Sequence, residues 1–585
     1  MKKWWIRAGM VALALVLAGC GIRIAGDQIG TGRDLGVAAS RTLLTAEELA
    51  TGPGAGEPVD NAAFLPVMGA EAPAHTFEGR LELIGEETVG ELRVIRGDPD
   101  VEPTVSHLPD FDFEYVQDGD DLIPVRRGMI ITEHPNWNYL LEPGRAWSEP
   151  GDGGWSRASL PFSLVWKGSN AVFNGLMTFV FNDAEVSGVW YQVTQETTVS
   201  LGADLWGWVE AEYHPGGVTD AAEIRRAFAD EVAHRFPSRP IGDLAEVYPG
   251  ADPQAFGVGV SNMTWYGFVV DGVQYLGGCE TRTGPYPYCE SMRAASYSTA
   301  KSAFVSLALM RLAQKYGSEV PLLLIKDYVP EASASPGDWS EVTFDNTLDM
   351  ATGNFRTAEY MVDEESWDTD PFWSEEYYDE IIAAAFDWPH SAPPGTQWVY
   401  RTSDTFIVTG ALANFLKSVE GPDADIFEFT VEEIYQPINL SPGAQTVLRT
   451  RDDNWQGRPY GGLGMWWVPD DLAKISTFLN VDAGRIDGVQ VLEPGILAAA
   501  LQRDPADRGV QVSGNRRYNN AFWGARYPSD FGCDIWVPHM LGYSGIVVAL
   551  FPNGTSYYYA SDGQDFTWEA ALRESDGIVP FCPDG

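Results

Sequence analysis

Ser298 and Lys301 are a pair of residues whose types and spacing could do chemistry. They lie in the stretch ASYSTAKSAF, residues 295–304, directly before an apolar run. Apolar residues recur there at steps of three and four, which predicts an amphipathic helix that ends near Gly317. Both side chains would then share one face of its first turn, where backbone amides favour a developing negative charge. A lysine held away from water can lose its proton and activate a serine hydroxyl.

The spacing alone does not establish a catalytic pair. The chain has eight lysines, and only Lys301 has a serine three positions before it. At ordinary serine usage, eight lysines give about half a chance match of this kind. A serine and a lysine at the exposed start of a helix are the alternative, so other parts of the chain must decide.

Two further stretches extend the pattern. VTFDNTLDMATGNF occupies residues 342–355, and PPGTQWVYRTSDTFIVTGAL occupies residues 393–412. Together with YSTAKSAFVSLAL, they resemble in type and order the motifs of serine hydrolases related to class C β-lactamases, D,D-peptidases and esterases. The resemblance covers residues 255–575. The form YRTSDT is most similar to nylon-oligomer hydrolases and esterases of this superfamily.

The resemblance implies a role for each matching residue. Ser298 would be the acylated nucleophile and Lys301 its partner base. Tyr400 would be the phenol that moves protons to and from Ser298, and a cationic Lys301 would lower the pKa of that phenol. Thr402 stands where the family has Asn or Ser and would join the same network.

The third motif departs from the lactamase pattern. β-Lactamases and D,D-peptidases carry Lys-Thr-Gly on the strand beside the site, but this chain has no lysine after Lys474. The stretch HMLGYSGIVVALFPNG, residues 539–554, is similar to an esterase-like His-x-Gly motif instead. Gly542 then matches the motif glycine, with Met540 at the usual Lys or His position and His539 one place early, either functional or structural. The oxyanion hole would consist of the backbone N–H groups of Ser298 and Tyr543.

We therefore expect an ester or amide hydrolase that needs no cofactor and acts on a small-molecule or peptide-like substrate. One alternative is a penicillin-binding activity of the β-lactamase or D,D-peptidase type. Another is a non-catalytic surface module that keeps the hydrolase fold. A Ser-His-Asp hydrolase would need Gly-x-Ser-x-Gly, which the sequence lacks. The scattered histidines do not form a metal-site pattern. Trp466, Trp467 and Trp523 could line the pocket but are more typical of a core.

The first twenty residues resemble an export signal. Lys2, Lys3 and Arg7 precede an apolar run that ends in LAGC. Eleven apolar residues at 1.5 Å each cannot cross ~30 Å of hydrocarbon, so a spanning helix is not expected. LAGC resembles a bacterial lipobox, which implies cleavage before Cys20 and a diacylglyceryl group on its sulfur. The alternative is an ordinary cleaved signal. We expect a lipid-anchored, extracytoplasmic protein of the bacterial cell envelope, in contact with the membrane only through Cys20.

Four further cysteines form an even set, which in an oxidising compartment predicts two disulfides. Three pairings are possible. Proximity in sequence favours Cys279–Cys289, and Cys533–Cys582 would then tie down the C-terminal tail.

The chain divides into segments of different composition. Residues 21–60 are rich in Gly and Ala and suggest a flexible tether. Residues 61–217 contain alternating runs at 80–85, 91–97, 128–133, 171–181 and 188–201, which predict an all-β sandwich or barrel. A helical pattern at 221–236 opens the segment 218–585, where Asp271-Gly272 predicts a hairpin. The resemblance implies that this segment is a β-lactamase-like domain, an antiparallel sheet flanked by helices. The predicted fold class is thus α+β, with an all-β N-terminal domain.

The net charge of −45 over 585 residues constrains the partners. Nucleic acid and anionic lipid surfaces would be repelled, so we expect neither as a partner. A solvated acidic surface suited to a saline habitat is the simplest explanation of this charge. The length predicts two domains with accessory segments.

Overall fold

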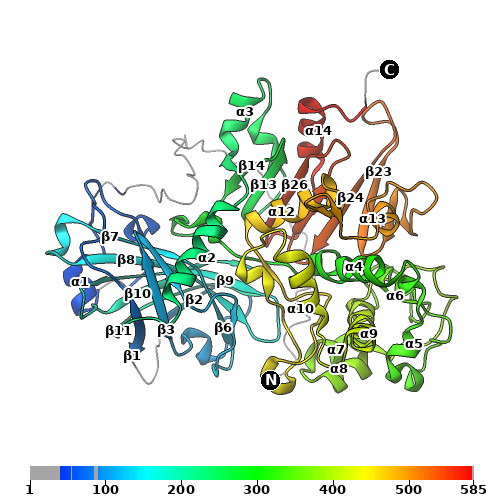
Figure 1. Cartoon of the computed structure of the whole chain (residues 1–585), viewed down its shortest axis with the longest axis horizontal. Helices are drawn as coiled ribbons and strands as arrows, with labels where there is room; N and C mark the ends of the chain where they lie inside the picture. The colour runs from blue at the N-terminus through cyan, green and yellow to red at the C-terminus, as the bar shows by residue number, and fades with distance from the viewer. Residues whose placement is uncertain (1–37, 39, 54–55, 85–89, 583–585) are drawn as a thin grey trace.

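A computed structural model of the chain describes residues 38, 40–53, 56–84 and 90–582. Two large sheets organise these residues, with the first on the left and the second at the upper right of Figure 1. Cys20 and the apolar run before it lie outside the described residues. Among the described helices, none is both long and apolar enough to cross a membrane.

The first sheet is antiparallel and closes into a barrel. Its strands follow the order β5-β6-β8-β7-β4-β3-β1-β11-β10-β9, and β8 also pairs with β9. This all-β architecture was predicted, and each predicted run contains a strand. The strands are β1 (Gly79–Ile84), β2 (Glu91–Arg96), β3 (Asp112–Asp118), β4 (Asp121–Pro124), β5 (Met129–Ile130), β6 (Trp137–Leu141), β7 (Gly144–Ser148), β8 (Ser156–Trp166), β9 (Val172–Phe181), β10 (Val189–Thr197) and β11 (Gly202–Pro215).

Aromatic side chains fill the inside of the barrel. The ring of Phe77 stacks on Tyr213 at 4.3 Å and also meets Phe179 and Phe181. Such side chains bury a large apolar area each, which stabilises the closed sheet. The aromatic residues of this region therefore serve mainly as core.

The second sheet follows the order β12-β14-β13-β26-β25-β24-β23-β22-β21, antiparallel except where β12 joins β14. The predicted hairpin is confirmed, because Val270 pairs with Val273 across Asp271-Gly272 and both turn residues have positive φ. The strands are β12 (Ser238–Pro240), β13 (Met263–Val270), β14 (Val273–Gly278), β21 (Val510–Ser513), β22 (Arg516–Asn519), β23 (Phe522–Tyr527), β24 (Ile535–Gly542), β25 (Ile546–Leu550) and β26 (Ser556–Ser561).

Helices cover both faces of the second sheet. On one face, α12 (Pro469–Asn480) packs on β13, β25 and β26. On the other, α14 (Glu569–Ile578) contributes Leu572 to a separate apolar core with Phe268 and Val547. Figure 1 shows α4 (Leu307–Tyr316) below this sheet, above α7 (Asp370–Ser374), α8 (Tyr378–Ala385) and α9 (Thr402–Glu420). The chain thus has the predicted α+β class, an antiparallel sheet flanked by helices.

One expectation about the N-terminal part needs revision. The predicted tether reached residue 60, but α1 (Ala46–Thr51) is a folded helix with a Thr45–Glu48 capping box. Leu44 and Leu49 are buried in the main core, so residues 40–53 are part of the folded protein. These apolar residues are few among the Gly and Ala, which hid them in the composition.

The predicted boundary at residues 217–218 precedes α2 (Ala221–Ala233). This helix matches the predicted one, but it packs on β3 and β4 of the barrel rather than on the second sheet. Arg225 at its start donates to Glu78 and to the Gln117 carbonyl. The boundary itself stays a prediction.

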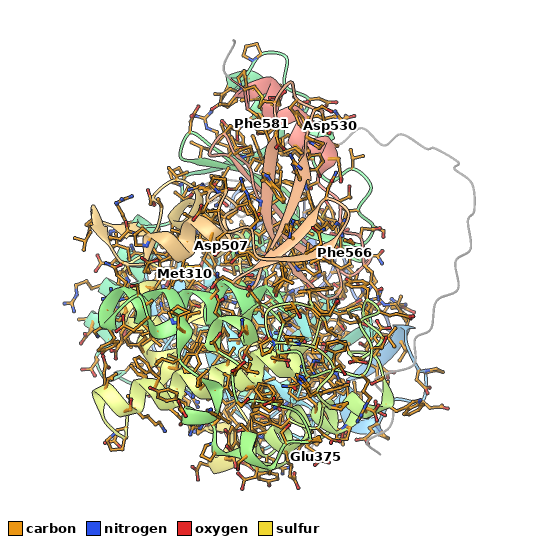
Figure 2. The ribbon with its side chains drawn as sticks, turned by 90° about the vertical axis from the view of Figure 1, so that its right-hand side faces the viewer. Met310, Glu375, Asp507, Asp530, Phe566 and Phe581 are labelled. Carbon is orange, nitrogen blue, oxygen red and sulfur yellow. A yellow bond between two sulfur atoms is a disulfide. The ribbon has the colours of Figure 1, made fainter. Side chains whose placement is uncertain are left out.

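Both predicted disulfides are present, Cys279–Cys289 and Cys533–Cys582. The second ties the C-terminal tail to the loop between β23 and β24. Figure 2 labels Phe581 and Asp530 beside α14, at the end of the sheet away from α4, and Phe531 packs on Phe581 at 5.2 Å.

Candidate active site

Ser298 follows a strained turn at the start of a helix. The short strand β17 (Ala294–Ala295) leads to Tyr297, whose φ of 41° is unusual for a residue with a side chain. Residues Lys301–Ser306 form a π-helical turn that continues into α4. The predicted helix is therefore correct in its extent, and its end at Tyr316 is followed by Gly317. Ser298 is half-buried, so its hydroxyl is accessible from solvent.

The structure brings together Ser298, Lys301 and Tyr400. Lys301 Nζ donates to Ser298 Oγ at 2.7 Å and to Tyr400 OH at 3.2 Å. Tyr400 OH donates to Ser298 Oγ at 2.8 Å. Tyr400 lies just before α9, about one hundred positions along the chain, so this geometry depends on tertiary packing, which includes that of α9 against α4 and α6 (Phe344–Leu348). Three groups that could exchange a proton are thus within hydrogen-bond reach of one another.

Thr402 and an unpredicted carboxylate, Glu364, complete the network. Lys301 Nζ donates to Thr402 Oγ1 at 3.0 Å and to the Gly462 carbonyl at 3.3 Å. The Thr402 hydroxyl and backbone N–H donate to the two oxygens of Glu364, at 2.5 and 2.8 Å. Glu364 lies in an irregular loop of several acidic residues, where no sequence signal separated it from its solvated neighbours.

Burial changes the pKa values of Lys301 and Tyr400 and so determines which of them is charged. It lowers the pKa of Lys301 to about 7, although the Glu364 carboxylate opposes the shift. Burial likewise raises the pKa of Tyr400 above its ordinary value, an effect that Glu364 reinforces. The expectation that Lys301 lowers the pKa of Tyr400 is therefore wrong: the phenol loses its water contacts and keeps its proton, and the amine is the group that titrates near neutrality.

The third motif lies beside the serine turn. β24 ends at Gly542, and a Cβ built there would come within 2.6 Å of the Ser296 carbonyl oxygen, so this close approach requires glycine. The ring of Tyr543 packs on that of Tyr297 at 5.5 Å. The two residues whose N–H groups were predicted to form an oxyanion hole therefore belong to adjacent turns.

Among the described residues, neither His539 nor Met540 has a hydrogen bond to Ser298, Lys301 or Tyr400. Met540 is fully buried in the main core. His539 is also buried, and burial lowers its pKa to about 3. Its Nδ1 lies 2.9 Å from the Val537 carbonyl, and its Nε2 has no hydrogen-bond partner among the described residues. His539 stacks at 6.4 Å behind Trp523, which in turn stacks on Tyr400, so its contact with the site is indirect.

The tryptophans considered as pocket walls differ in position. Trp466 and Trp467 are wholly buried beneath the serine turn, where Trp467 Nε1 donates to Thr299. Trp523 lies 5.3 Å from Trp398, another ring that contacts Tyr400. Trp398 stacks on the exposed ring of Tyr360 at 5.9 Å. A series of aromatic rings thus connects solvent to the phenol.

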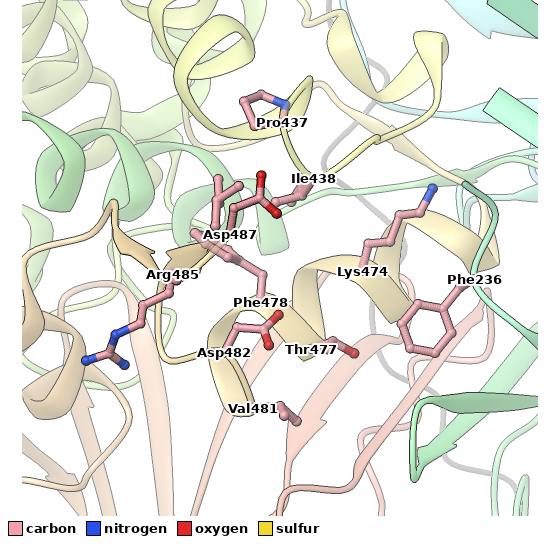
Figure 3. Close-up of a pocket in the computed structure, with 12 residues that line it drawn as sticks. Phe236, Pro437, Ile438, Lys474, Thr477, Phe478, Val481, Asp482, Arg485 and Asp487 are labelled. Atoms are coloured by element: carbon pink, nitrogen blue, oxygen red, sulfur yellow. The ribbon is translucent and has the colours of Figure 1, made fainter. Parts of the chain in front are cut away.

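One cavity lies away from the serine network. It has a volume of about 690 Å³ and lies between α12, the segment after it and residues 437–438. Figure 3 shows Lys474 and Phe236 on one side and Arg485 and Asp487 on the other. None of its lining residues belongs to the serine network. Among the described residues, no group of three or more His, Cys, Asp or Glu side chains could hold a metal ion.

The fold and the site define a mixed α and β protein with a hydrogen-bonded serine, lysine and tyrosine at the edge of an antiparallel sheet. No known protein family and no curated protein sequence matches the chain. Similar solved structures include a protein assigned as a 6-aminohexanoate-dimer hydrolase from Bacillus anthracis, with 16% identity, 54% of this chain and 78% of that one covered, and a TM-score of 0.40.

Two further similar structures are a class C β-lactamase and the hydrolase EstCE1, which has promiscuous acyltransferase activity. The β-lactamase is 12% identical, with 64% of this chain and 100% of that chain covered and a TM-score of 0.39. EstCE1 is 12% identical, with 60% and 98% covered and a TM-score of 0.37. These values are too low to place the chain in a family, so its chemistry has to be argued from the site.

Proposed function

We propose that the protein is a serine hydrolase that cleaves an ester or amide through an acyl-enzyme on Ser298. The observation that carries the proposal is the hydrogen-bonded triangle of Ser298, Lys301 and Tyr400 at a half-buried position. A nucleophile within hydrogen-bond reach of a base whose pKa lies near neutrality is the arrangement that nucleophilic catalysis requires.

The surroundings of Lys301 favour its neutral form as the base. The only hydroxyl proton of Thr402 goes to Glu364, and the Gly462 carbonyl has none. Both groups therefore accept from Lys301. When the amine loses one proton, its two remaining N–H bonds can stay on Thr402 and Gly462, and its lone pair can then face Ser298 Oγ and accept the hydroxyl proton.

Acylation follows from this arrangement. As the hydroxyl proton of Ser298 passes to Lys301 Nζ, Oγ forms a bond to the substrate carbonyl carbon. The carbonyl oxygen takes the negative charge, which the N–H groups of Ser298 and Tyr543 would stabilise. The bond to the leaving alcohol or amine then breaks. The Tyr400 hydroxyl gives its proton to the leaving group, and Lys301 passes the proton taken from Ser298 to the Tyr400 oxygen. Water attacks the ester of Ser298 by the same route, releasing the acid and restoring the hydroxyl.

An activity-based probe tests the proposal. Intact-mass analysis after exposure to a fluorophosphonate or an activated ester should show one covalent adduct, which Ser298→Ala should abolish. Thr299→Ala, which changes the neighbouring hydroxyl, is the control for a general effect on the turn. An unlabelled but folded protein would favour the non-catalytic surface module, and labelling that survives Ser298→Ala would indicate another nucleophile.

We also propose that the protein is exported and held in the cell envelope by a lipid on Cys20. The LAGC ending of the apolar run supports this, and so do two disulfides, which persist in oxidising compartments. Mass spectrometry of the native protein should find a diacylglyceryl-modified N-terminal cysteine. A mature chain that begins downstream of Cys20, or one that keeps the whole apolar run, would refute the anchor.

A further inference from the structure

One residue of the barrel reaches the turn that carries Ser298. Asn170 lies between β8 and β9 and is 1% exposed. Its Oδ1 accepts hydrogen bonds from the Tyr297 backbone N–H at 2.6 Å, from Ser296 Oγ at 2.9 Å and from the Gly464 N–H at 2.9 Å. Its Nδ2 donates to the Met465 carbonyl at 2.9 Å. One side chain therefore joins two segments of the second sheet's domain that lie far apart in sequence.

The orientation of this amide is fixed by its partners. The backbone N–H groups of Tyr297 and Gly464 can only donate, and the Met465 carbonyl can only accept. Since these three backbone partners have fixed roles, a flipped Asn170 would lose its hydrogen bonds to Tyr297, Gly464 and Met465. At a buried position this would leave several polar groups unpaired, so the side chain is held firmly.

The segment that Asn170 holds is strained. Tyr297 has a φ of 41°, a conformation that costs a residue with a side chain free energy and persists only when its surroundings enforce it. Ser298 comes next, so the direction of its N–H and of its Oγ depends on this turn.

A second barrel segment holds the opposite turn. Ser544, next to Tyr543, has a φ of 73° and is fully buried. Its Oγ accepts a hydrogen bond from the Val199 backbone N–H at 3.2 Å, in the segment after β10. The Tyr297 hydroxyl donates to the Thr197 carbonyl at 3.5 Å, and the Tyr297 ring packs on that of Tyr543, which connects the two turns. Each strained turn that would supply an oxyanion-hole N–H is thus fixed by a contact with the barrel.

We propose that the N-terminal barrel is part of the catalytic apparatus, with Asn170 as the positioning residue that sets the Ser298 turn and so aligns the oxyanion hole. This inference rests on the proposed function. It assigns a role to a domain whose composition indicated none, and it predicts that the second sheet and its helices are not an active hydrolase without the barrel.

The barrel also contains a matched control. Asn174, in β9, is likewise buried, and its amide likewise bridges to the other domain. It donates to the Arg293 carbonyl at 2.8 Å and accepts from the Arg293 N–H at 2.9 Å, five positions before Ser298. Its loss should weaken the same interface without releasing Tyr297.

The experiment compares Asn170→Ala and Asn174→Ala in the full chain, with turnover of one good ester and the melting temperature measured for each. Removing an oxyanion-hole donor typically lowers kcat by about 10²–10³-fold. In Asn170→Ala the donor is displaced and not removed, so kcat should fall by at least about tenfold. KM should change by less than about threefold. Asn174→Ala should keep kcat near that of the wild type even if its melting temperature falls.

Asn170→Asp provides the conservative variant. It keeps the acceptor for Tyr297 but puts a carboxylate oxygen where Nδ2 donates to the Met465 carbonyl, and the two oxygens repel each other, so its kcat should lie between those of the wild type and Asn170→Ala. If Asn170→Ala does not fold, a wild-type kcat in Asn170→Asp overturns the proposal. A wild-type kcat in folded Asn170→Ala, or equal losses of kcat in the two alanine variants, also overturns it. Failure of the proposed function is distinct, because the wild-type protein would then turn over no ester, or Ser298→Ala would turn it over as fast as the wild type.

Discussion

Lys301 has to lose a proton at a position where a carboxylate opposes the loss. Burial lowers its pKa to about 7 and Glu364 opposes this, so the amine changes charge within the physiological range. Glu364 does not touch the amine, and its oxygens are held by Thr402. Burial raises the pKa of Glu364 as well, while Lys301 and the hydrogen bonds from Thr402 oppose that rise, so the charges of Glu364 and Lys301 depend on each other.

The first prediction concerns the amine itself. Lys301→Met keeps the apolar stem and removes the base, so the protein should fold while ester turnover falls by about 10²–10⁴-fold. Tyr400→Phe should have a comparable effect. Because the groups act as one unit, the double variant should lose little more than either single variant. Turnover of one ester by the folded variants, with circular dichroism as the control for folding, checks this. Near-normal activity in Lys301→Met would show that the Ser298–Lys301 spacing is coincidental.

A second prediction concerns pH. Because the neutral amine is the base, kcat/KM for a neutral ester should rise as pH increases through about 7. Glu364→Gln keeps an acceptor for Thr402 but removes the negative charge that raises the pKa of Lys301. The pKa of Lys301 should then fall further, and the rising limb should move to lower pH.

The control for the pH prediction is Glu365→Gln, which removes the next carboxylate along the chain, an exposed one. Solvent screens it, so the limb should stay in place. If the rising limb of the pH profile shifts equally in both variants, Glu364 acts on Lys301 only as one of many surface charges and not through its buried position.

At the scale of elements, the sheet and the tail are held by different means. α12 and α14 cover the two faces of the second sheet with apolar side chains, whereas the tail after α14 is attached by a covalent bond. Cys533 and Cys582 are 49 positions apart, and Cys279 and Cys289 only 10. In the chain-entropy account, closing the longer loop restricts the unfolded state more.

A third prediction follows from these separations. Cys582→Ser should lower the free energy of unfolding by up to about 4 kcal/mol, and Cys289→Ser by up to about 3 kcal/mol in the same account. Denaturant unfolding under oxidising conditions measures both. If each variant, unfolded in excess reductant, still differs from reduced wild-type protein by the full amount, the serine substitution and not the lost crosslink is responsible.

On the scale of the whole molecule, charge selects among substrates. The chain carries a formal charge of −45, and Met540, which the motif resemblance aligns with the lysine of β-lactamases, is buried. An anionic substrate would meet a repulsive surface and find no cation at this motif position.

The fourth prediction is therefore a preference for neutral esters over penicillins. Losing a charge-assisted hydrogen bond costs about 1.5–3 kcal/mol, or roughly 10- to 150-fold in binding. Short-chain neutral esters should be turned over far faster than penicillins. Added salt should raise kcat/KM for an anionic substrate and leave that for a neutral ester unchanged. Efficient penicillin hydrolysis without ester activity would support the β-lactamase alternative instead.

Local features of this protein were predictable because they depend on neighbours in the chain. The Ser298–Lys301 pair follows from the helical period, and the Asp271-Gly272 hairpin from the φ values that two turn residues allow. The sequence of β2 alternates between polar and apolar residues, and that of β9 is a run of residues typical of strands, so both strands could be predicted. β3, β6 and β8 were not singled out, since barrel strands with polar and aromatic residues on both faces blur the period of two.

The tertiary structure alone decided which distant groups meet Ser298 and what charge they carry. Glu364 lies more than sixty positions from Lys301, and Asn170 more than one hundred positions before Ser298; neither has a local pattern that marks it. The pKa of Tyr400 was expected to fall because a lysine was near, but burial raises it. Desolvation depends on everything packed around a group, so it cannot be read from the spacing of two residues. The sequence determined which groups could react. Packing determined their protonation states and the conformation of the turn at Tyr297, which orients Ser298.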